Sequence, residues 1–111
     1  MNDEQRATLD DFKQTVNMTA AELGRWLDTD ASQSVGQKTS EGSESTGHKS
    51  GRHVVGLLRT RQADYTDADF AEMRRVVGYA RRHLAQRPAG DVSETPWRYS
   101  LMNWGHDPLK G

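Results

Sequence analysis

The sequence predicts an all-α fold, and three observations support that prediction. No segment alternates polar and apolar residues over a useful length with the two-residue period of a strand. Five segments instead repeat apolar residues at intervals of three and four, as one face of a helix requires. Four of these segments follow a Ser or Thr suited to cap a helix. With 111 residues, we expect residues 1–111 to form one compact domain of about five helices.

The first two helices are expected at residues 3–16 and 20–27. Leu9, Phe12 and Val16 make the apolar stripe of the first. The sequence "TAAE" at 19–22 is a capping box that starts the second.

Residues 31–50 change the composition abruptly. Ser, Thr and Gly dominate this stretch, and Val35 is its only large apolar residue. Such a segment buries too little apolar surface to offset the entropy lost on ordering. We therefore expect a long Gly/Ser-rich loop between the second and third helices, mobile without a ligand, that acts as a linker or a binding loop.

A third helix is expected at 50–61 with Ser50 as its N-cap, and a fourth at 67–86 with Thr66 as its N-cap. The short connection between them loosely resembles a helix-turn-helix, in which the second helix reads nucleic acid. The turn lacks the usual glycine, so two ordinary neighbouring helices remain the alternative.

The last helix is expected within "TPWRYSLMNWG", where Thr95 is the N-cap and Gly105 follows the end. Three apolar residues at spacing i, i+4 and i+7 form a stripe that we expect to be buried: Trp97, Leu101 and Trp104. Three polar residues gather at the helix end, in a position to hold a loop or a partner: Asn103, His106 and Asp107.

Charge is distributed unevenly along the chain. The net charge is −1, yet residues 1–50 carry five basic and nine acidic side chains, and residues 51–111 carry ten and seven. The chain has no cysteine, which excludes disulfides, thiolate zinc sites and thiol nucleophiles. No apolar run approaches the ~20 residues of a membrane span, and the N-terminus does not resemble a signal peptide. We expect a cytoplasmic protein that does not contact a membrane.

The fourth helix carries the clearest functional pattern. Opposite its apolar face lie five residues, Arg74, Arg75, Gly78, Arg81 and Arg82, and no acid occurs within 74–87. Arginine pairs with phosphate through its planar fork, and Gly78 would let a backbone approach closely. A solvated helix face that balances the acidic first half of the chain is the alternative.

The stretch "GSESTGHKS" at 42–50 nearly matches a phosphate-binding loop. His48 interrupts the motif and no strand precedes it, so we do not expect nucleotide hydrolysis. Lys49 and Arg52 flank the expected helix start at Ser50, where free amides would favour a backbone phosphate.

No catalytic or metal-binding pattern stands out. The four histidines form no i, i+4 pair, and we expect each to make ordinary hydrogen bonds. Ser100, His106 and Asp107 contain the residue types of a hydrolase triad, but no nucleophile elbow accompanies them. The sequence therefore predicts a non-enzymatic protein without a metal or a cofactor.

Four segments together resemble a known family: "SVGQK" (34–38), "GHKSGR" (47–52), "ADYTDADFAEMRRVVGYARRHLAQRP" (63–88) and "WRYSLMNWGHDPLK" (97–110). The chain is similar from about residue 17 onward to small actinobacterial and fungal proteins that share domain of unknown function 3140. The resemblance implies no catalytic residue. Some members are labelled DNA-binding proteins. The resemblance therefore implies that this chain also binds DNA, which we take as an expectation.

Two functions are expected from these observations. The first is a nucleic-acid-binding, nucleoid-associated protein that contacts DNA phosphates through six residues: Lys49, Arg52, Arg74, Arg75, Arg81 and Arg82. The net charge of −1 counts against it, because dedicated DNA-binding proteins are usually strongly basic. The second is a protein-interaction module whose basic helix docks an acidic partner or the acidic first half of a second copy.

Overall fold

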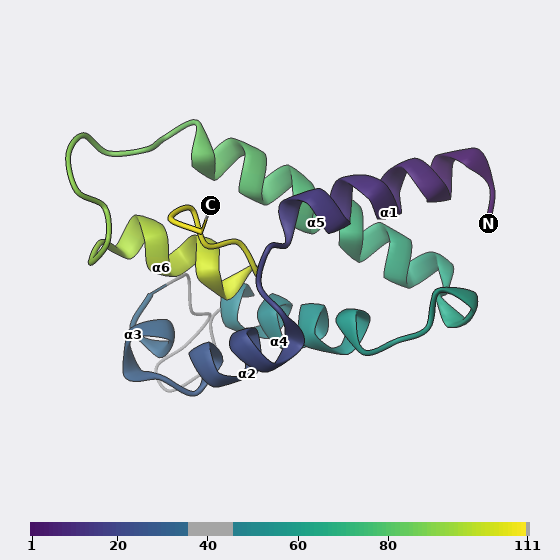
Figure 1. The fold of residues 1–111 in the computed structure, drawn as a ribbon, viewed down its shortest axis with the longest axis horizontal. Coiled ribbons are helices and arrows are strands. Elements are labelled where there is room, and N and C mark those ends of the chain that lie inside the picture. The colour runs from purple at the N-terminus through teal and green to yellow at the C-terminus, as the bar shows by residue number, and fades with distance from the viewer. Residues whose placement is uncertain (36–45, 111) are drawn as a thin grey trace.

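The computed structural model describes residues 1–35 and 46–110, and these residues form helices with no strand among them (Figure 1). The all-α prediction is confirmed. In chain order the elements are α1 (Asp3–Thr15), α2 (Ala20–Leu27), α3 (Asp30–Gln33), α4 (Thr46–Leu58), the 3₁₀ helix η1 (Gln62–Asp64), α5 (Asp67–Leu84) and α6 (Pro96–Asn103). None of the helices in the described part of the chain is long and apolar enough to span a membrane.

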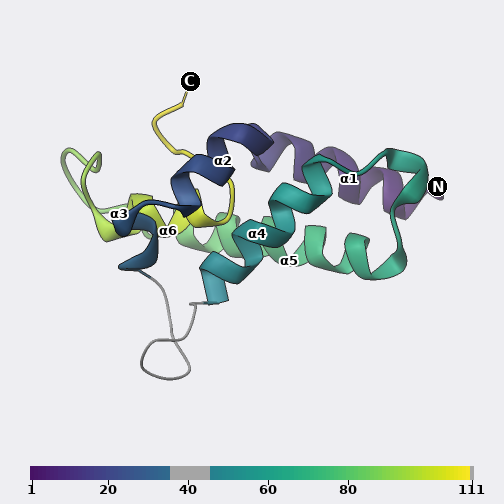
Figure 2. The ribbon, with the colours of Figure 1, turned by 90° about the horizontal axis from the view of Figure 1, so that it is seen from below.

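The helices pack in two main pairs. α1 lies along α5, α2 lies along α4, and α6 closes one end by contacting α2, α3, α4 and α5 (Figures 1 and 2). Residues 59–66 connect α4 to α5 and contain η1, and this connection is longer than the turn of about 3–4 residues in a helix-turn-helix. The structure therefore favours the alternative of two ordinary neighbouring helices.

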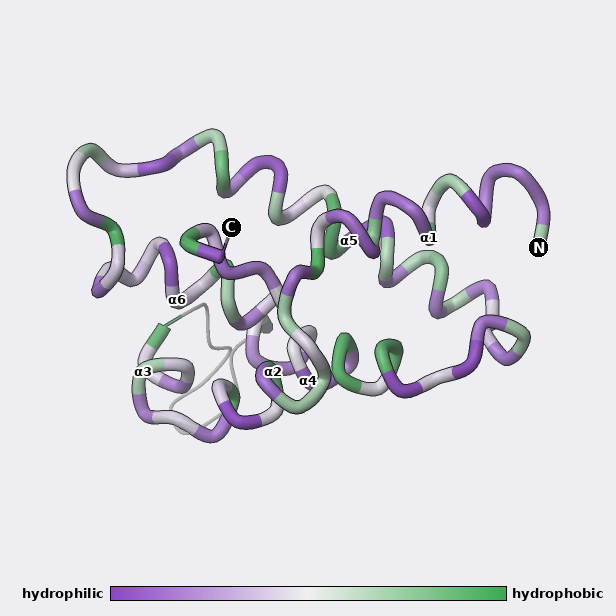
Figure 3. Tube along the Cα trace, viewed as in Figure 1, coloured by the Kyte–Doolittle hydropathy of each residue, from purple (hydrophilic) through white to green (hydrophobic). Residues whose placement is uncertain are grey.

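Two apolar clusters hold the helices together. The larger joins α1, α2, α4 and α5 and includes Trp104 from the end of α6. The smaller joins Ala80, Val92, Trp97 and Leu101 and ties α6 to the second half of α5. The stripe predicted on α6 is thus buried, although its members divide between the two clusters. Figure 3 shows hydrophobic and hydrophilic residues interspersed along each of the longer helices, as amphipathic packing requires.

The helix ends follow local chemistry. The side chains of Thr19, Thr66 and Thr95 accept hydrogen bonds from the backbone amides of the first turns of α2, α5 and α6. Gly105 has φ +93° and ends α6 with amide bonds from Gly105 to Met102 and from His106 to Leu101. This pair of bonds is a Schellman motif, so Gly105 has the terminating role that the sequence predicts.

Both ends of the loop predicted at 31–50 are helical in the structure. Helix α3 occupies Asp30–Gln33, because Thr29 caps it and Ser32 is fully buried. Helix α4 begins at Thr46, four residues before the predicted start. Residues 36–45 of the predicted loop lie outside the described residues.

Close glycine packing explains the longer α4. A Cβ on Gly47 would lie 3.0 Å from Nε1 of Trp104, and a Cβ on Gly51 would lie 2.2 Å from the backbone oxygen of Asn103. These two glycines on one face therefore let α4 rest directly against the end of α6. The first turn of α4 is stabilised by this tertiary contact, which local sequence preference does not reveal.

Candidate nucleic-acid interface

Helix α5 presents four exposed arginines in two rows. At 100° per residue, Arg74 and Arg81 fall in one row and Arg75 and Arg82 in the other, with Gly78 between them. The opposite side supplies five buried residues: Phe70, Met73, Val76, Val77 and Ala80. Burial of that side fixes both rows toward solvent. We call the surface formed by Arg74, Arg75, Arg81 and Arg82 around Gly78 the basic face.

The first row borders a small cavity between α1 and α5. The cavity has a volume of about 220 Å³, and its lining includes Arg74, Arg81 and Gly78 of α5 and Asp11 of α1. Nη2 of Arg81 lies 3.5 Å from Oδ1 of Asp11, and the two side chains are 65% and 46% exposed. An ion pair this exposed contributes little stability, so Arg81 can exchange Asp11 for a phosphate at low cost. Arg74 has no ion-pair partner among residues 1–35 and 46–110.

The sequence predicts that a backbone can approach closely at Gly78, but in the structure a side chain of the same helix covers this position. Nη1 of Arg82 lies 3.2 Å from the position that a Cβ on residue 78 would occupy. The guanidinium of Arg82 therefore leans over the glycine toward the first row. Within the described parts of the chain, Arg82 also has no acidic partner.

Arg75 connects the second row to α4. Its Nη2 donates to Oγ of the buried Ser50 at 3.3 Å, and its Nη1 lies 3.6 Å from Oε2 of Glu72. These residues, with Lys49 and His53, line a cavity of about 190 Å³ between α4 and α5. The exposed Lys49 thus lies at the edge of the basic face, as expected for a shared phosphate-binding surface.

The anion site expected at the start of the third helix is wrong. Because α4 begins at Thr46, Ser50 lies inside the helix and its hydroxyl accepts from Arg75 instead of capping. Lys49 and Arg52 therefore do not flank free amides at Ser50. Arg52 is exposed on α4 and is not among the residues that line the cavity with Lys49.

Acidic groups mark the boundary of the basic face near α4. His53 lies 3.7 Å from Asp69 and 4.0 Å from Glu72, and the Glu72 side chain is only 11% exposed. The pKa of Asp69 is lowered mainly by the hydrogen bond from the Thr66 backbone amide, which with the Thr66 hydroxyl and His53 outweighs partial burial. These carboxylates would repel a phosphate, so the surface favourable to anions extends from Arg75 toward Arg82.

A stack of six side chains runs along one side of the basic face. In order it contains Arg75, Trp104, Tyr79, His83, Trp97 and Arg87. The ring centroids of Tyr79 and Trp104 are 4.2 Å apart, those of Tyr79 and His83 are 5.3 Å apart, and those of His83 and Trp97 are 5.9 Å apart. At each end of the stack a guanidinium carbon lies 5.4 Å from the centroid of an indole ring, with Arg75 over Trp104 and Arg87 over Trp97.

This stack fixes α6 against α5. Trp97 Nε1 donates to the His83 backbone oxygen at 2.7 Å, and the His83 ring bonds the Trp97 backbone oxygen at 3.0 Å. Sequence reasoning missed the stack, although two spacings point to it. Arg75, Tyr79, His83 and Arg87 recur every four residues, while the two tryptophans of α6 are seven residues apart.

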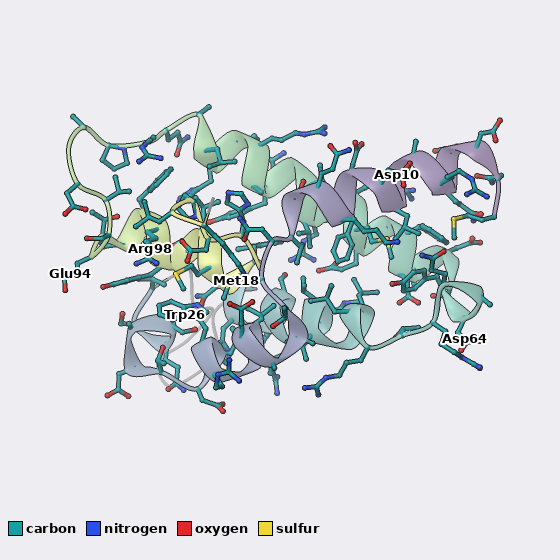
Figure 4. The ribbon with its side chains drawn as sticks, in the orientation of Figure 1. Asp10, Met18, Trp26, Asp64, Glu94 and Arg98 are labelled. Atoms are coloured by element: carbon teal, nitrogen blue, oxygen red, sulfur yellow. The ribbon has the colours of Figure 1, made fainter. Side chains whose placement is uncertain are left out.

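The polar residues at the end of α6 hold other segments in place. Buried Asn103 accepts from the Trp26 indole at 2.8 Å and from the Ser32 hydroxyl at 2.5 Å, and it donates to the Ser32 backbone oxygen. In Figure 4 the labelled Trp26 side chain extends from α2 toward α6, where its ring also contacts Tyr99. Arg98 makes two hydrogen bonds to Asp107, at 3.1 and 3.0 Å.

The triad arrangement drawn from the sequence does not form a catalytic site. The His106 ring bonds the Thr15 backbone oxygen at 2.7 Å, and the Asp107 carboxylate is engaged by Arg98. Burial raises the pKa of Asp107, but the hydrogen bonds from Arg98 and from the Leu109 amide outweigh it and leave the pKa lowered. Both residues therefore have structural partners.

The remaining histidine rings also have protein partners. The His48 ring bonds the Leu27 backbone oxygen at 2.7 Å, which adds a link between α4 and α2. No group of three or more His, Asp or Glu side chains suited to a metal occurs among the described residues.

The comparisons with known proteins place the chain in a family. No curated protein and no solved structure matches it. The family described as "Protein of unknown function (DUF3140)" matches residues 11–102. This range contains the basic face, the cavity between α4 and α5, all of the lining of the other cavity except Thr8, and all of the aromatic stack except Trp104. The chain therefore belongs to the DUF3140 family.

Proposed function

We propose that this chain is a non-enzymatic, nucleoid-associated DNA-binding protein of the cytoplasm. It contacts backbone phosphates through the basic face of α5, with Lys49 at its edge. The observation that carries the proposal is the grouping of four exposed arginines around Gly78, which, within residues 1–35 and 46–110, only one acid from another helix engages, namely Asp11. The DNA-binding label of some proteins that the sequence resembles agrees with this function.

The proposed contacts are with the sugar-phosphate backbone. A guanidinium fork binds phosphate oxygens without distinguishing bases, so binding is expected to depend weakly on sequence. The two rows lie on either side of Gly78, which the guanidinium of Arg82 covers, so a DNA strand would meet the arginine side chains and not the helix backbone. Arg81 must loosen its exposed ion pair with Asp11, and Arg75 must loosen its contacts with the largely buried Glu72 and with Ser50, whereas Arg74 and Arg82 have no acidic partner among the described residues.

The test is the salt dependence of binding to a short fluorescent duplex of mixed sequence. Four phosphate contacts predict a loss of affinity of about 150-fold between about 50 and 200 mM salt. The variant Arg74→Gln/Arg82→Gln should reduce the slope of log K against log salt by about two. Arg6→Gln/Arg25→Gln removes the same charge from exposed positions on α1 and α2 and should leave the slope unchanged.

Two results would contradict the proposal. One is the absence of binding at low salt. The other is equal binding of poly-glutamate and DNA, because carboxylate recognition would then favour the acidic protein partner as the ligand of this surface.

A further inference from the structure

Helix α1 carries an acidic counterpart of the basic face. Residues 3–11 read "DEQRATLDD" and residues 74–82 read "RRVVGYARR". Each segment begins with a charged pair. A small residue follows four positions after the first charge, and a second charged pair follows seven and eight positions after the first charge. The same spacing therefore generates two charged rows around a small residue on both helices, with opposite sign.

The acidic rows of α1 are exposed and mostly unpaired. The acidic face consists of Asp3, Glu4, Asp10 and Asp11 around Ala7. Of these four acids, only Asp11 has an ion-pair partner among the described residues, and that partner is Arg81 of the same chain. Asp10, which is labelled on α1 in Figure 4, is exposed. The basic residues of α1, Arg6 and Lys13, fall in a separate row.

We propose that the acidic face of α1 in one copy of the chain docks on the basic face of α5 in a second copy. The two helices lie side by side and run in the same direction (Figures 1 and 2), and the cavity lined by Asp11, Arg74 and Arg81 shows that both faces border one surface. A two-fold axis parallel to the helices places α1 of each copy over α5 of the other. The result is a reciprocal dimer with two identical acid–base contacts.

The chemistry makes this dimer weak and sensitive to salt. Each exposed ion pair contributes little to the free energy of association. Added salt screens these charges, because the Debye length is only about 10 Å at about 0.1 M salt. Ala7 adds little bulk between the acidic rows, so these rows can reach the basic face, where the Arg82 guanidinium covers Gly78. The arginines covered in the dimer are those that bind DNA, so DNA and the second copy compete for them. This competition rests on the proposed function, whereas the self-association does not.

The test measures molar mass by sedimentation equilibrium without nucleic acid. At about 20 mM salt and up to about 0.5 mM chain, the wild-type mass should rise from 12.5 kDa toward twice that value, and at about 500 mM salt it should return to 12.5 kDa. Arg74→Glu/Arg82→Glu and Asp3→Lys/Asp10→Lys should each be monomeric alone. Mixing the two variants should restore a dimer, because each supplies the face that the other has lost.

Matched controls separate local contacts from net charge. Arg25→Glu/Arg59→Glu and Asp28→Lys/Asp30→Lys make the same charge changes on exposed residues elsewhere and should dimerise as the wild type does. Asp10→Lys alone leaves the first turn of α1 unchanged, so it replaces the double variant if that variant folds poorly. This single variant should weaken the dimer at least fivefold. Circular dichroism confirms folding of each variant.

Three results would overturn the dimer. They are a wild type that stays monomeric at low salt, a dimer unaffected by either charge reversal, and reversed variants that do not associate when mixed. Adding short duplex DNA to the wild-type dimer should produce one chain per complex. If DNA fails to bind while the mixing experiment succeeds, the proposed function fails and the dimer stands. If DNA binds and the mixing experiment fails, the dimer alone is refuted.

Discussion

Replacement of Gly51 by Ala tests the close packing that positions α4. A Cβ on Gly51 would lie 2.2 Å from the Asn103 backbone oxygen and 2.8 Å from Cδ2 of Leu27. An ordinary carbon–oxygen contact is roughly 3.3 Å or longer, so α4 and α6 must move apart by roughly 1 Å. Overpacking of a core costs about 1–3 kcal/mol, and a backbone obstacle places this case near the upper end. Alanine recovers about 1 kcal/mol of helix propensity.

The net expectation is a loss of about 2 kcal/mol in the free energy of unfolding. For a domain of this size that corresponds to a decrease in Tm of about 8 °C. Differential scanning calorimetry and urea unfolding followed by circular dichroism measure both quantities. Gly24→Ala on α2 and Gly56→Ala on α4 are the controls, because a Cβ at either position meets no atom within 4 Å.

The controls should raise stability by about 0.5–1 kcal/mol, since only the helix-propensity gain applies. The same substitution thus has opposite signs at two positions of α4. A Gly51→Ala protein as stable as the wild type would refute the close packing between α4 and α6.

Two further predictions concern the polar groups at the end of α6. Asn103→Ala leaves the partly buried Trp26 indole and the buried Ser32 groups without partners and should lower the free energy of unfolding by about 2–4 kcal/mol in urea titrations. The lowered pKa of Asp107 means that its carboxylate stabilises the fold above its ordinary pKa, and this contribution disappears as the pH falls through the folded-state value. Asp107→Asn should therefore destabilise the protein at neutral pH through loss of the Arg98 contact, and its deficit should shrink as the pH falls below the ordinary range of an aspartate; a deficit that does not change with pH would contradict this account.

Local patterns in the sequence predict much of the fold. The caps at Thr19, Thr66 and Thr95 and the terminator Gly105 are short-range chemistry, and the structure confirms each of them. The face of α5 that is buried also follows from its period of 3.6 residues. Element type and helix face were therefore predictable over most of the described chain.

The start of α4 was not predictable in this way. Its composition resembles a loop, and its helical state depends on Gly47 and Gly51 meeting residues of α6 more than 50 positions away. The same limit applies to the burial of Ser32 by Asn103. Single-sequence patterns do not report which distant residues meet, so the anion site expected at Ser50 was misplaced.

The candidate site was predictable as a surface and not as a set of contacts. Spacing alone placed Arg74, Arg75, Arg81 and Arg82 outward, and the structure agrees. The Asp11 contact and the position of Arg82 over Gly78 depend on side-chain conformations and on helix pairing, which the sequence does not encode locally.

The stack between α5 and α6 gives the protein an intrinsic optical signal. Each end of the stack is a guanidinium over an indole, with Arg75 on Trp104 and Arg87 on Trp97. An anion that draws either arginine away removes a cation–π contact and alters the surroundings of that tryptophan. Because Arg75 belongs to the basic face, occupancy of that face should change the tryptophan emission of the unlabelled chain. Ligands of this surface can therefore be screened by fluorescence alone.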